Sequence, residues 1–269
     1  MTTILVATDF SANARWATDY ALELANRLRG HLVLTCVYNP LCTGSPDSIT
    51  PVDEGQCRRT LVQLSQLRNQ LLGATNWPVD ISVVARPGPV VSSLVDEAAN
   101  QCADLLVMSL ESDEPPKTRQ LGDLATDMIS HTSVPMLLVP PGSCYQAMQH
   151  LVLGVDLSSP VDALALASVR WFAHLFDAVV DVVCMGHEPD GDLKKAAWGI
   201  RDLLSGQPHT FSFLADNDPV TVLDDYLDEH HANLIMLLPK PHSRLRTFLL
   251  ESVTQKVARL ARVPVLAAV

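Results

Sequence analysis

The sequence carries the same pattern twice, and this internal repeat limits what the chain can fold into more than any other feature. The tripeptide Asp9-Phe10-Ser11 follows a first apolar run, and Asp156-Leu157-Ser158 follows a second one near mid-chain. The segment 134–139, Val-Pro-Met-Leu-Leu-Val, has its counterpart in 263–268, Val-Pro-Val-Leu-Ala-Ala. Such a repeat predicts two copies of one domain, and 269 residues suffice for two hydrophobic cores.

Strands and helices are predicted to alternate within each copy. Helical periodicity marks the first half around 61–72, 90–99 and 121–129, between five apolar runs that predict strands at 4–7, 32–37, 79–85, 105–109 and 136–139. This alternation is typical of a parallel sheet with right-handed crossovers, so the predicted fold class is α/β with two tandem doubly wound domains. The pattern breaks at 140–143, which places the domains at residues 1–143 and 148–269.

A helix is also predicted directly after the first strand. Its apolar residues recur at three- and four-residue spacing from Ala14 to Leu28. Gly30 stands where a glycine that terminates a helix is expected, because glycine adopts the left-handed conformation without strain.

Charge and cysteine usage exclude several classes of partner. The net charge of -11 disfavours binding to nucleic acid or to an anionic membrane surface. The chain starts without a basic leader, and no apolar run approaches the roughly 20 residues of a membrane helix. The six cysteines form no Cys-x-x-Cys pair, which favours reduced structural thiols. We therefore expect a cytoplasmic protein with neither nucleic acid nor membrane as partner.

No motif of a known catalytic site is present. The sequence lacks Gly-x-Gly-x-x-Gly, the Walker loop, the Gly-x-Ser-x-Gly elbow and His-Glu-x-x-His. His230 and His231 are adjacent, and adjacent side chains on a helix point about 100° apart, which suits surface histidines better than a metal site. Trp171-Phe172, and Leu223 with Tyr226, fit helix positions that face a core. The chain is expected not to be an enzyme and to hold no metal.

Taken together, three features resemble the universal stress protein family. They are the opening Ala7-Thr8-Asp9-Phe10-Ser11, the middle Gly88-Pro89 leading to 103–108 (Ala-Asp-Leu-Leu-Val-Met), and the closing segment 134–139. The resemblance covers essentially the whole chain. It implies, for each half, a five-stranded parallel sheet flanked by helices, an adenine nucleotide alpha hydrolase-like fold. It also implies that the halves pair internally through their last strands, and it leaves a homodimer of chains and unknown protein partners open.

Many members of that family bind ATP with a loop patterned Gly-x2-Gly-x9-Gly-Ser/Thr, in which glycines let the backbone approach the phosphates. In the first half this spacing falls on Ser109, Ser112, Gly122 and Asp123. Two glycines have become serine, and the final hydroxyl position has become a carboxylate that repels phosphate at close range. The sequence therefore predicts a degenerate phosphate loop.

The second half retains even less of the loop. The same spacing falls on Leu238, Pro241, Glu251 and Ser252, which keeps the last hydroxyl but no glycine, and Pro241 removes a backbone donor. Two interpretations of the cations Lys240, Arg244 and Arg246 remain open. Their side chains could bind an anion in place of the lost loop, or they could form a charged surface exposed to solvent.

The resemblance also implies base- or ribose-binding positions at the strand ends. Asp9 and Asp156 end the first strand of each half, and Val37 and Met185 end the second strands. An Asp two residues before a Ser at such a turn also fits a plain helix cap, and both interpretations remain open.

The predicted function is a nonenzymatic stress-response protein that acts as an interaction or sensor module with degenerate nucleotide-binding loops. The alternative is an adenine-nucleotide switch that uses the first domain. No cofactor is required by the sequence, and ATP or AMP is the ligand that the alternative would take.

Overall fold

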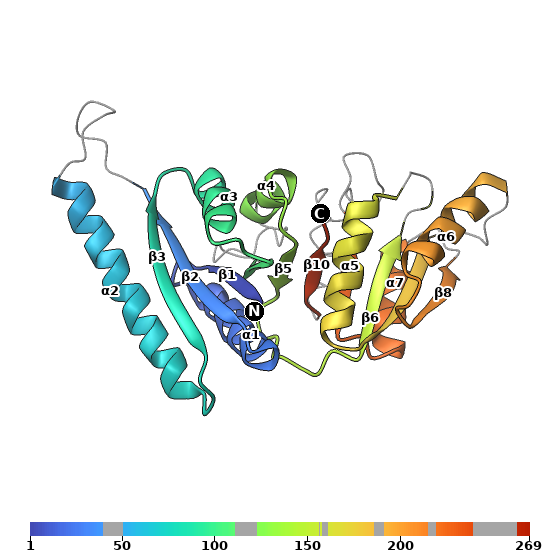
Figure 1. The fold of residues 1–269 in the computed structure, drawn as a ribbon, viewed down its shortest axis with the longest axis horizontal. Coiled ribbons are helices and arrows are strands. Elements are labelled where there is room, and N and C mark those ends of the chain that lie inside the picture. The colour runs from blue at the N-terminus through green and yellow to red at the C-terminus, as the bar shows by residue number, and fades with distance from the viewer. Residues whose placement is uncertain are drawn as a thin grey trace.

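The structure is a computed structural model that describes residues 1–39, 51–110, 123–155, 157, 161–185, 191–214, 219–238 and 263–269. In the first half, strands and helices alternate along the chain: β1 (Thr3–Ala7), α1 (Ala12–Leu28), β2 (His31–Tyr38), α2 (Pro51–Ala74), β3 (Asp80–Pro87), α3 (Val90–Asn100), β4 (Leu105–Ser109), α4 (Asp123–His131) and β5 (Met136–Val139). The five predicted strands of this half are all present (Figure 1).

The second half repeats this order. Its described elements are β6 (His150–Val155), α5 (Ala163–Leu175), β7 (Val179–Met185), α6 (Gly191–Leu203), β8 (His209–Leu214), α7 (Pro219–Glu229), β9 (Leu234–Leu237) and β10 (Val265–Ala267). All of the described strands join one ten-stranded sheet in the order β3-β2-β1-β4-β5-β10-β9-β6-β7-β8. Neighbouring strands within each half are parallel, which confirms two tandem doubly wound α/β units.

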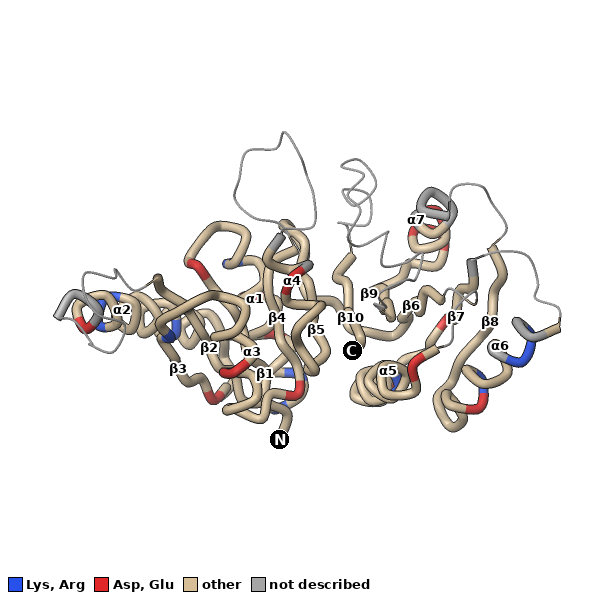
Figure 2. Tube along the Cα trace, turned by 90° about the horizontal axis from the view of Figure 1, so that it is seen from above, with Lys and Arg blue, Asp and Glu red and all other residues tan. Residues whose placement is uncertain are grey.

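The halves meet through their last strands. β5 and β10 pair antiparallel, with Leu137 opposite Leu266 at the centre, and lie side by side in the middle of the molecule (Figure 2). Both side chains are fully buried. The internal pairing expected from the resemblance is therefore present, and it makes the two five-stranded sheets continuous.

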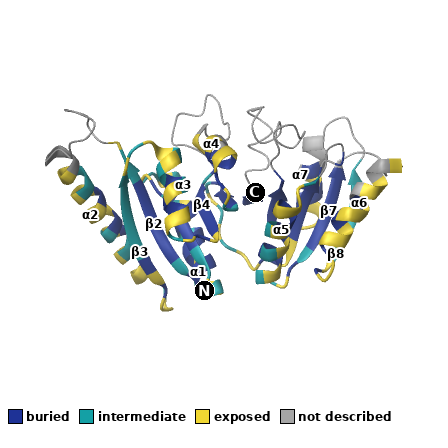
Figure 3. Ribbon diagram, turned by 45° about the horizontal axis from the view of Figure 1, so that its top comes forward, coloured by how far each residue is buried: buried dark blue, intermediate teal, exposed yellow. Residues whose placement is uncertain are grey.

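Helices cover both faces of the sheet, which explains why the strand sequences are apolar without alternation. One core lies against α1, α2, α5 and α6, and the other against α3, α4 and α7. Figure 3 shows the inner strands buried, the edge strands β3 and β8 mostly half-buried, and the exposed residues gathered on the outer faces of the helices. Among the described residues, none of the helices is both long and apolar enough to span a membrane.

The end of α1 differs from its prediction in one respect. The helix stops at Leu28, but the residue in the left-handed conformation is Arg29, with φ of 51°, rather than Gly30. A glycine is needed at Gly30 for space instead, because a Cβ there would lie 2.6 Å from the carbonyl oxygen of Thr2. The predicted stop is at the right place, and the stated reason for the glycine is wrong.

Candidate functional site

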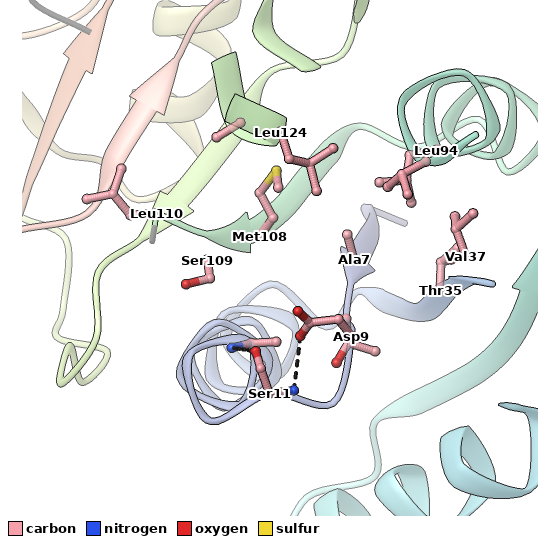
Figure 4. Close-up of a pocket in the computed structure, with 14 residues that line it drawn as sticks. Ala7, Asp9, Ser11, Thr35, Val37, Leu94, Met108, Ser109, Leu110 and Leu124 are labelled. Atoms are coloured by element: carbon pink, nitrogen blue, oxygen red, sulfur yellow. Dashed lines mark hydrogen bonds between the residues drawn. The ribbon is translucent and has the colours of Figure 1, made fainter. Parts of the chain in front are cut away.

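A cavity of about 270 Å³ lies at the carboxyl ends of β1, β2 and β4, beside the N-terminal turns of α1, α3 and α4 (Figure 4). β1 stands between β2 and β4, and the strand order reverses there: the chain runs from β1 to β2 and β3 on one side and then returns to β4 and β5 on the other. α/β proteins bind ligands at such a switch point. Most lining side chains are apolar; the described lining is Ala7, Thr8, Asp9, Ser11, Ala14, Thr35, Val37, Val90, Leu94, Met108, Ser109, Leu110, Leu124 and Ala125.

The turn between β1 and α1 is held by its own side chains. Thr8 Oγ1 accepts a hydrogen bond from the Phe10 backbone N–H at 3.1 Å, and Asp9 Oδ1 accepts one from the Ser11 N–H at 3.0 Å. Phe10 has a φ of 66°, a conformation that costs energy for a bulky residue. The two hydrogen bonds offset that strain and fix the exposed Asp9 carboxylate at the mouth of the cavity.

The helix cap at this turn is Ser11, and not Asp9. The Ser11 side chain accepts from the Ala14 N–H at 3.1 Å, which satisfies one orphan donor of the first helical turn. Asp9 bonds only the N–H of the cap residue, and its Oδ2 has no hydrogen-bond partner among the described residues. Plain capping therefore does not account for Asp9, and its carboxylate remains available to a ligand.

Three of the predicted site residues meet in this cavity. Asp9, Val37 and Ser109 all line it, although they come from three separate strand ends. Asp123 is the first residue of α4, the helix whose next two residues also line the cavity. Of the predicted positions in the second half, Met185 ends β7 and Leu238 directly follows β9. The other predicted positions lie outside the described residues: Ser112, Gly122, Pro241, Lys240, Arg244, Arg246, Glu251, Ser252 and Asp156.

Sequence reasoning missed the residue that is chemically most unusual here, Thr35. Its side chain is fully buried, and its Oγ1 has no hydrogen-bond partner. A polar residue inside the apolar run 32–37 was the signal that pointed to it. The apolar walls contributed by α3 and α4, Leu94 and Leu124, were beyond reach of local sequence reasoning because crossovers bring them to the site.

The charge inside the cavity is negative. Asp9 is the single titratable side chain among the described lining residues. Burial, followed by the charge of Asp9, raises the pKa of the nearby Cys36 thiol to about 11. Cys36 therefore stays protonated at neutral pH and is a poor nucleophile.

The corresponding strand ends of the second half are more apolar. By sheet register Gly154 and its partner Val183 take the positions of Ala7 and Thr35. Val183 is fully buried, whereas the residues that would complete a second cavity lie outside the described part of the chain.

The aromatic and histidine residues that the sequence analysis assigned to a core or to the surface have the expected burial. Phe172 and Leu223 are fully buried, Tyr226 is 8% exposed, and His230 and His231 are exposed at the end of α7. The described residues contain no cluster of three or more His, Cys, Asp or Glu side chains suited to a metal ion.

The fold and the cavity define a class: a tandem α/β protein with a ligand cavity at the carboxyl ends of its first parallel sheet. The family model described as the universal stress protein family matches the chain twice, over residues 1–140 and 148–268. The chain belongs to the universal stress protein family.

Solved structures agree with this fold. A universal stress protein from Archaeoglobus fulgidus is similar with a TM-score of 0.67 and 14% identity, over 99% of this chain and 95% of that one. A protein of unknown function from Pseudomonas aeruginosa is similar with a TM-score of 0.56 and 14% identity, over 99% and 92%. A universal stress protein in complex with cAMP is 24% identical over 52% of this chain and 98% of that one, with a TM-score of 0.43. None of the curated protein sequences compared with the chain is significantly similar to it.

Proposed function

We propose that this chain is a nonenzymatic sensor whose N-terminal half binds adenosine or AMP in preference to ATP. The cavity at the carboxyl ends of β1, β2 and β4 is the observation that carries this proposal. Its walls suit a flat apolar ring, and its mouth presents a carboxylate and hydroxyls that suit the hydroxyl groups of a sugar.

The charge of the cavity supports selection against a triphosphate. The described lining contains the Asp9 carboxylate and no Lys or Arg, so each added phosphate charge meets repulsion rather than a counter-ion. The first residue of α4 is a second acidic residue, Asp123. A helix N-terminus favours a bound phosphate, and an acidic residue at this position of the sequence opposes that preference.

The sugar of the ligand would bond Asp9. The carboxylate is already oriented by the Ser11 N–H, so a ligand hydroxyl can donate to Oδ2 without further ordering of the side chain. A charged acceptor makes a stronger hydrogen bond than a neutral one, so Asp9 would supply much of the polar recognition.

The same lining supports a nonenzymatic role. Asp9 is the single titratable side chain among the described lining residues, so they offer no pair of groups for acid–base catalysis. Ligand binding would instead change how the protein interacts with a partner.

Isothermal titration of the nucleotide-stripped protein with adenosine, AMP and ATP, with magnesium present, tests the proposal. Adenosine and AMP are expected to bind at one site per chain, and ATP at least tenfold more weakly. Asp9→Asn should weaken adenosine binding about tenfold, because the amide oxygen keeps the bond from Ser11 but lacks the charge. Asp156→Asn, at the repeat position in the second half, is the matched control and should change nothing.

The opposite result is equally informative. If none of the three ligands produces heat at two temperatures, the cavity is not a nucleoside site. The search should then turn to protein partners that bind the tandem fold as an interaction module.

A further inference from the structure

A second cavity adjoins the turn between β1 and α1, on the face of the sheet that α1 and α2 cover. It has a volume of about 360 Å³, a size at which small-molecule sites begin, and it lies between the first turns of α1 and the second half of α2. Thr8 and Ser11 line both cavities. Asp9 lines the first and Phe10 the second, so neighbouring residues of one turn contribute to different cavities.

Three glutamines of α2 form one wall of this cavity. Gln63, Gln66 and Gln70 follow one another at spacings of three and four residues, which places them on one face of the helix. Each side-chain amide offers two N–H donors and an acceptor oxygen. Gln63 and Gln66 are exposed to solvent, so their amides can exchange water for the polar groups of a ligand.

The cavity carries little net charge. Arg15 is the single charged side chain among its described lining residues, and Arg15 Nε donates to both carboxylate oxygens of Asp19 at 2.9 and 3.0 Å. Arg15 Nη1 donates to Oε1 of Gln70 at 2.9 Å, which links the α1 wall to the α2 wall. Because Asp19 balances the charge of Arg15, the cavity suits a neutral polar ligand better than an anion.

Two apolar side chains add a surface for a carbon skeleton. Phe10 is partly buried against the core, Leu67 is buried, and both line the cavity beside the amides. Phe10 has a φ of 66°, and bulky residues in such conformations concentrate at ligand-binding and active sites. Amides around a small apolar surface match a ring that carries hydroxyl groups on its edge and C–H groups on its faces.

We propose that the cavity between α1 and α2 is a second ligand site, which binds a neutral sugar in its cyclic form. Sugar hydroxyls both donate and accept hydrogen bonds, as the amides of Gln63 and Gln66 do. The C–H face of the ring lies against Phe10 and Leu67. This site is separate from the nucleoside cavity and does not depend on the function proposed for it.

Titration of the ¹⁵N-labelled full chain with glucose, galactose and mannose, followed by ¹H–¹⁵N NMR, tests the proposal. The side-chain amide signals of Gln63, Gln66 and Gln70, assigned with single Gln→Ala variants, should shift saturably with at least one sugar. A Kd on the order of 1 mM is expected, because an open site gains little from each hydrogen bond that replaces one to water.

Two variants and one charged sugar locate and classify the site. Gln66→Ala should weaken binding about fivefold, whereas Asn69→Ala, which removes an exposed amide of the same helix outside the cavity, should change it by less than about twofold. Glucuronate, a sugar ring with an added carboxylate, should bind no more tightly than glucose because Asp19 already pairs with Arg15.

Three results would overturn the proposal. One is the lack of a saturable shift with all three neutral sugars up to about 50 mM, well above the expected Kd. Another is equal weakening by Gln66→Ala and Asn69→Ala, which would place the sugar elsewhere. The third is glucuronate binding more than about tenfold tighter than glucose, which would make the cavity an anion site of Arg15. Adenosine titration is a separate measurement, so its failure would leave this proposal standing.

Discussion

The ion pair between Arg86 of β3 and Glu97 of α3 leads to a sharp prediction about stability. The Glu97 side chain is 0% exposed, whereas that of Arg86 is 42% exposed, and Arg86 Nε donates to Glu97 Oε2. Gln101 Nε2 donates to the other carboxylate oxygen at 2.7 Å. Replacing Arg86 by Met keeps the apolar stem but leaves a buried carboxylate with the amide as its remaining partner.

The size of the effect lies between two known limits. Removing one member of a fully buried pair costs about 3–5 kcal/mol, and exposed pairs contribute roughly 0–1 kcal/mol. Because Arg86 is partly exposed and Gln101 keeps its bond to Glu97, we expect Arg86→Met to lower the free energy of unfolding by about 2 kcal/mol. Urea unfolding should show this as a midpoint lower by about 1 M for the transition that includes the first half.

A double mutant separates the ion pair from other effects. Arg86→Met combined with Glu97→Met removes both charges, and its cost should be clearly smaller than the sum of the single costs. Arg15→Met, which breaks the exposed pair of Arg15 with Asp19, is the control and should cost less than about 0.5 kcal/mol. A loss below 0.5 kcal/mol for Arg86→Met would refute the reasoning.

Two further predictions concern backbone space and thiol ionisation. Gly30→Ala should destabilise the protein by about 1–3 kcal/mol because the new Cβ meets a backbone oxygen. Gly199→Ala, which places its Cβ in open space within α6, should stabilise the protein by about 0.5–1 kcal/mol. Thermal melts that rank the two variants in the other order would contradict this. Burial raises the pKa of Cys36 to about 11 and of Cys184 to about 12, so the exposed Cys102 and Cys144 should react with a thiol reagent at pH 8 before these two, and equal rates would contradict this. Because the pKa values of Cys36 and Cys184 in the folded protein exceed the ordinary thiol value of 9.0, folding favours the protonated thiols. Their contribution to the free energy of unfolding should be fully present below pH 9 and be lost as the pH rises through the folded pKa values, which unfolding measured at several pH values would detect.

The fold could be predicted because the repeat and the strand pattern are local signals that agree with each other. Apolar runs bounded by turns gave all five strands of the first half, and the order of elements then allowed few topologies. Local conformation was harder. Arg29 takes the left-handed position at a helix end where glycine is the usual choice, and only the approach of Thr2 explains Gly30.

The two repeat copies also differ where the sequence suggested equality. Ser11 caps α1 directly after the Asp9 turn, whereas α5 begins at Ala163 and is capped by Asp162. The strand-end positions Asp9 and Val37 were expected from the family resemblance. The helix residues that close the cavity were not, since long-range crossovers carry no signature in a local pattern. Tertiary placement, rather than residue type, decides which hydroxyl is left without a partner.

The antiparallel contact of β5 with β10 has a consequence for how the protein can change over time. In a symmetric homodimer every substitution occurs in both subunits, so neither binding site can be altered alone. Here the two paired units are parts of one chain, and the segment 140–149 between them makes their association independent of protein concentration. Each copy is consequently free to change by itself, and the presence of Thr35 in one and Val183 in the other is a difference that a pair of identical subunits could not have.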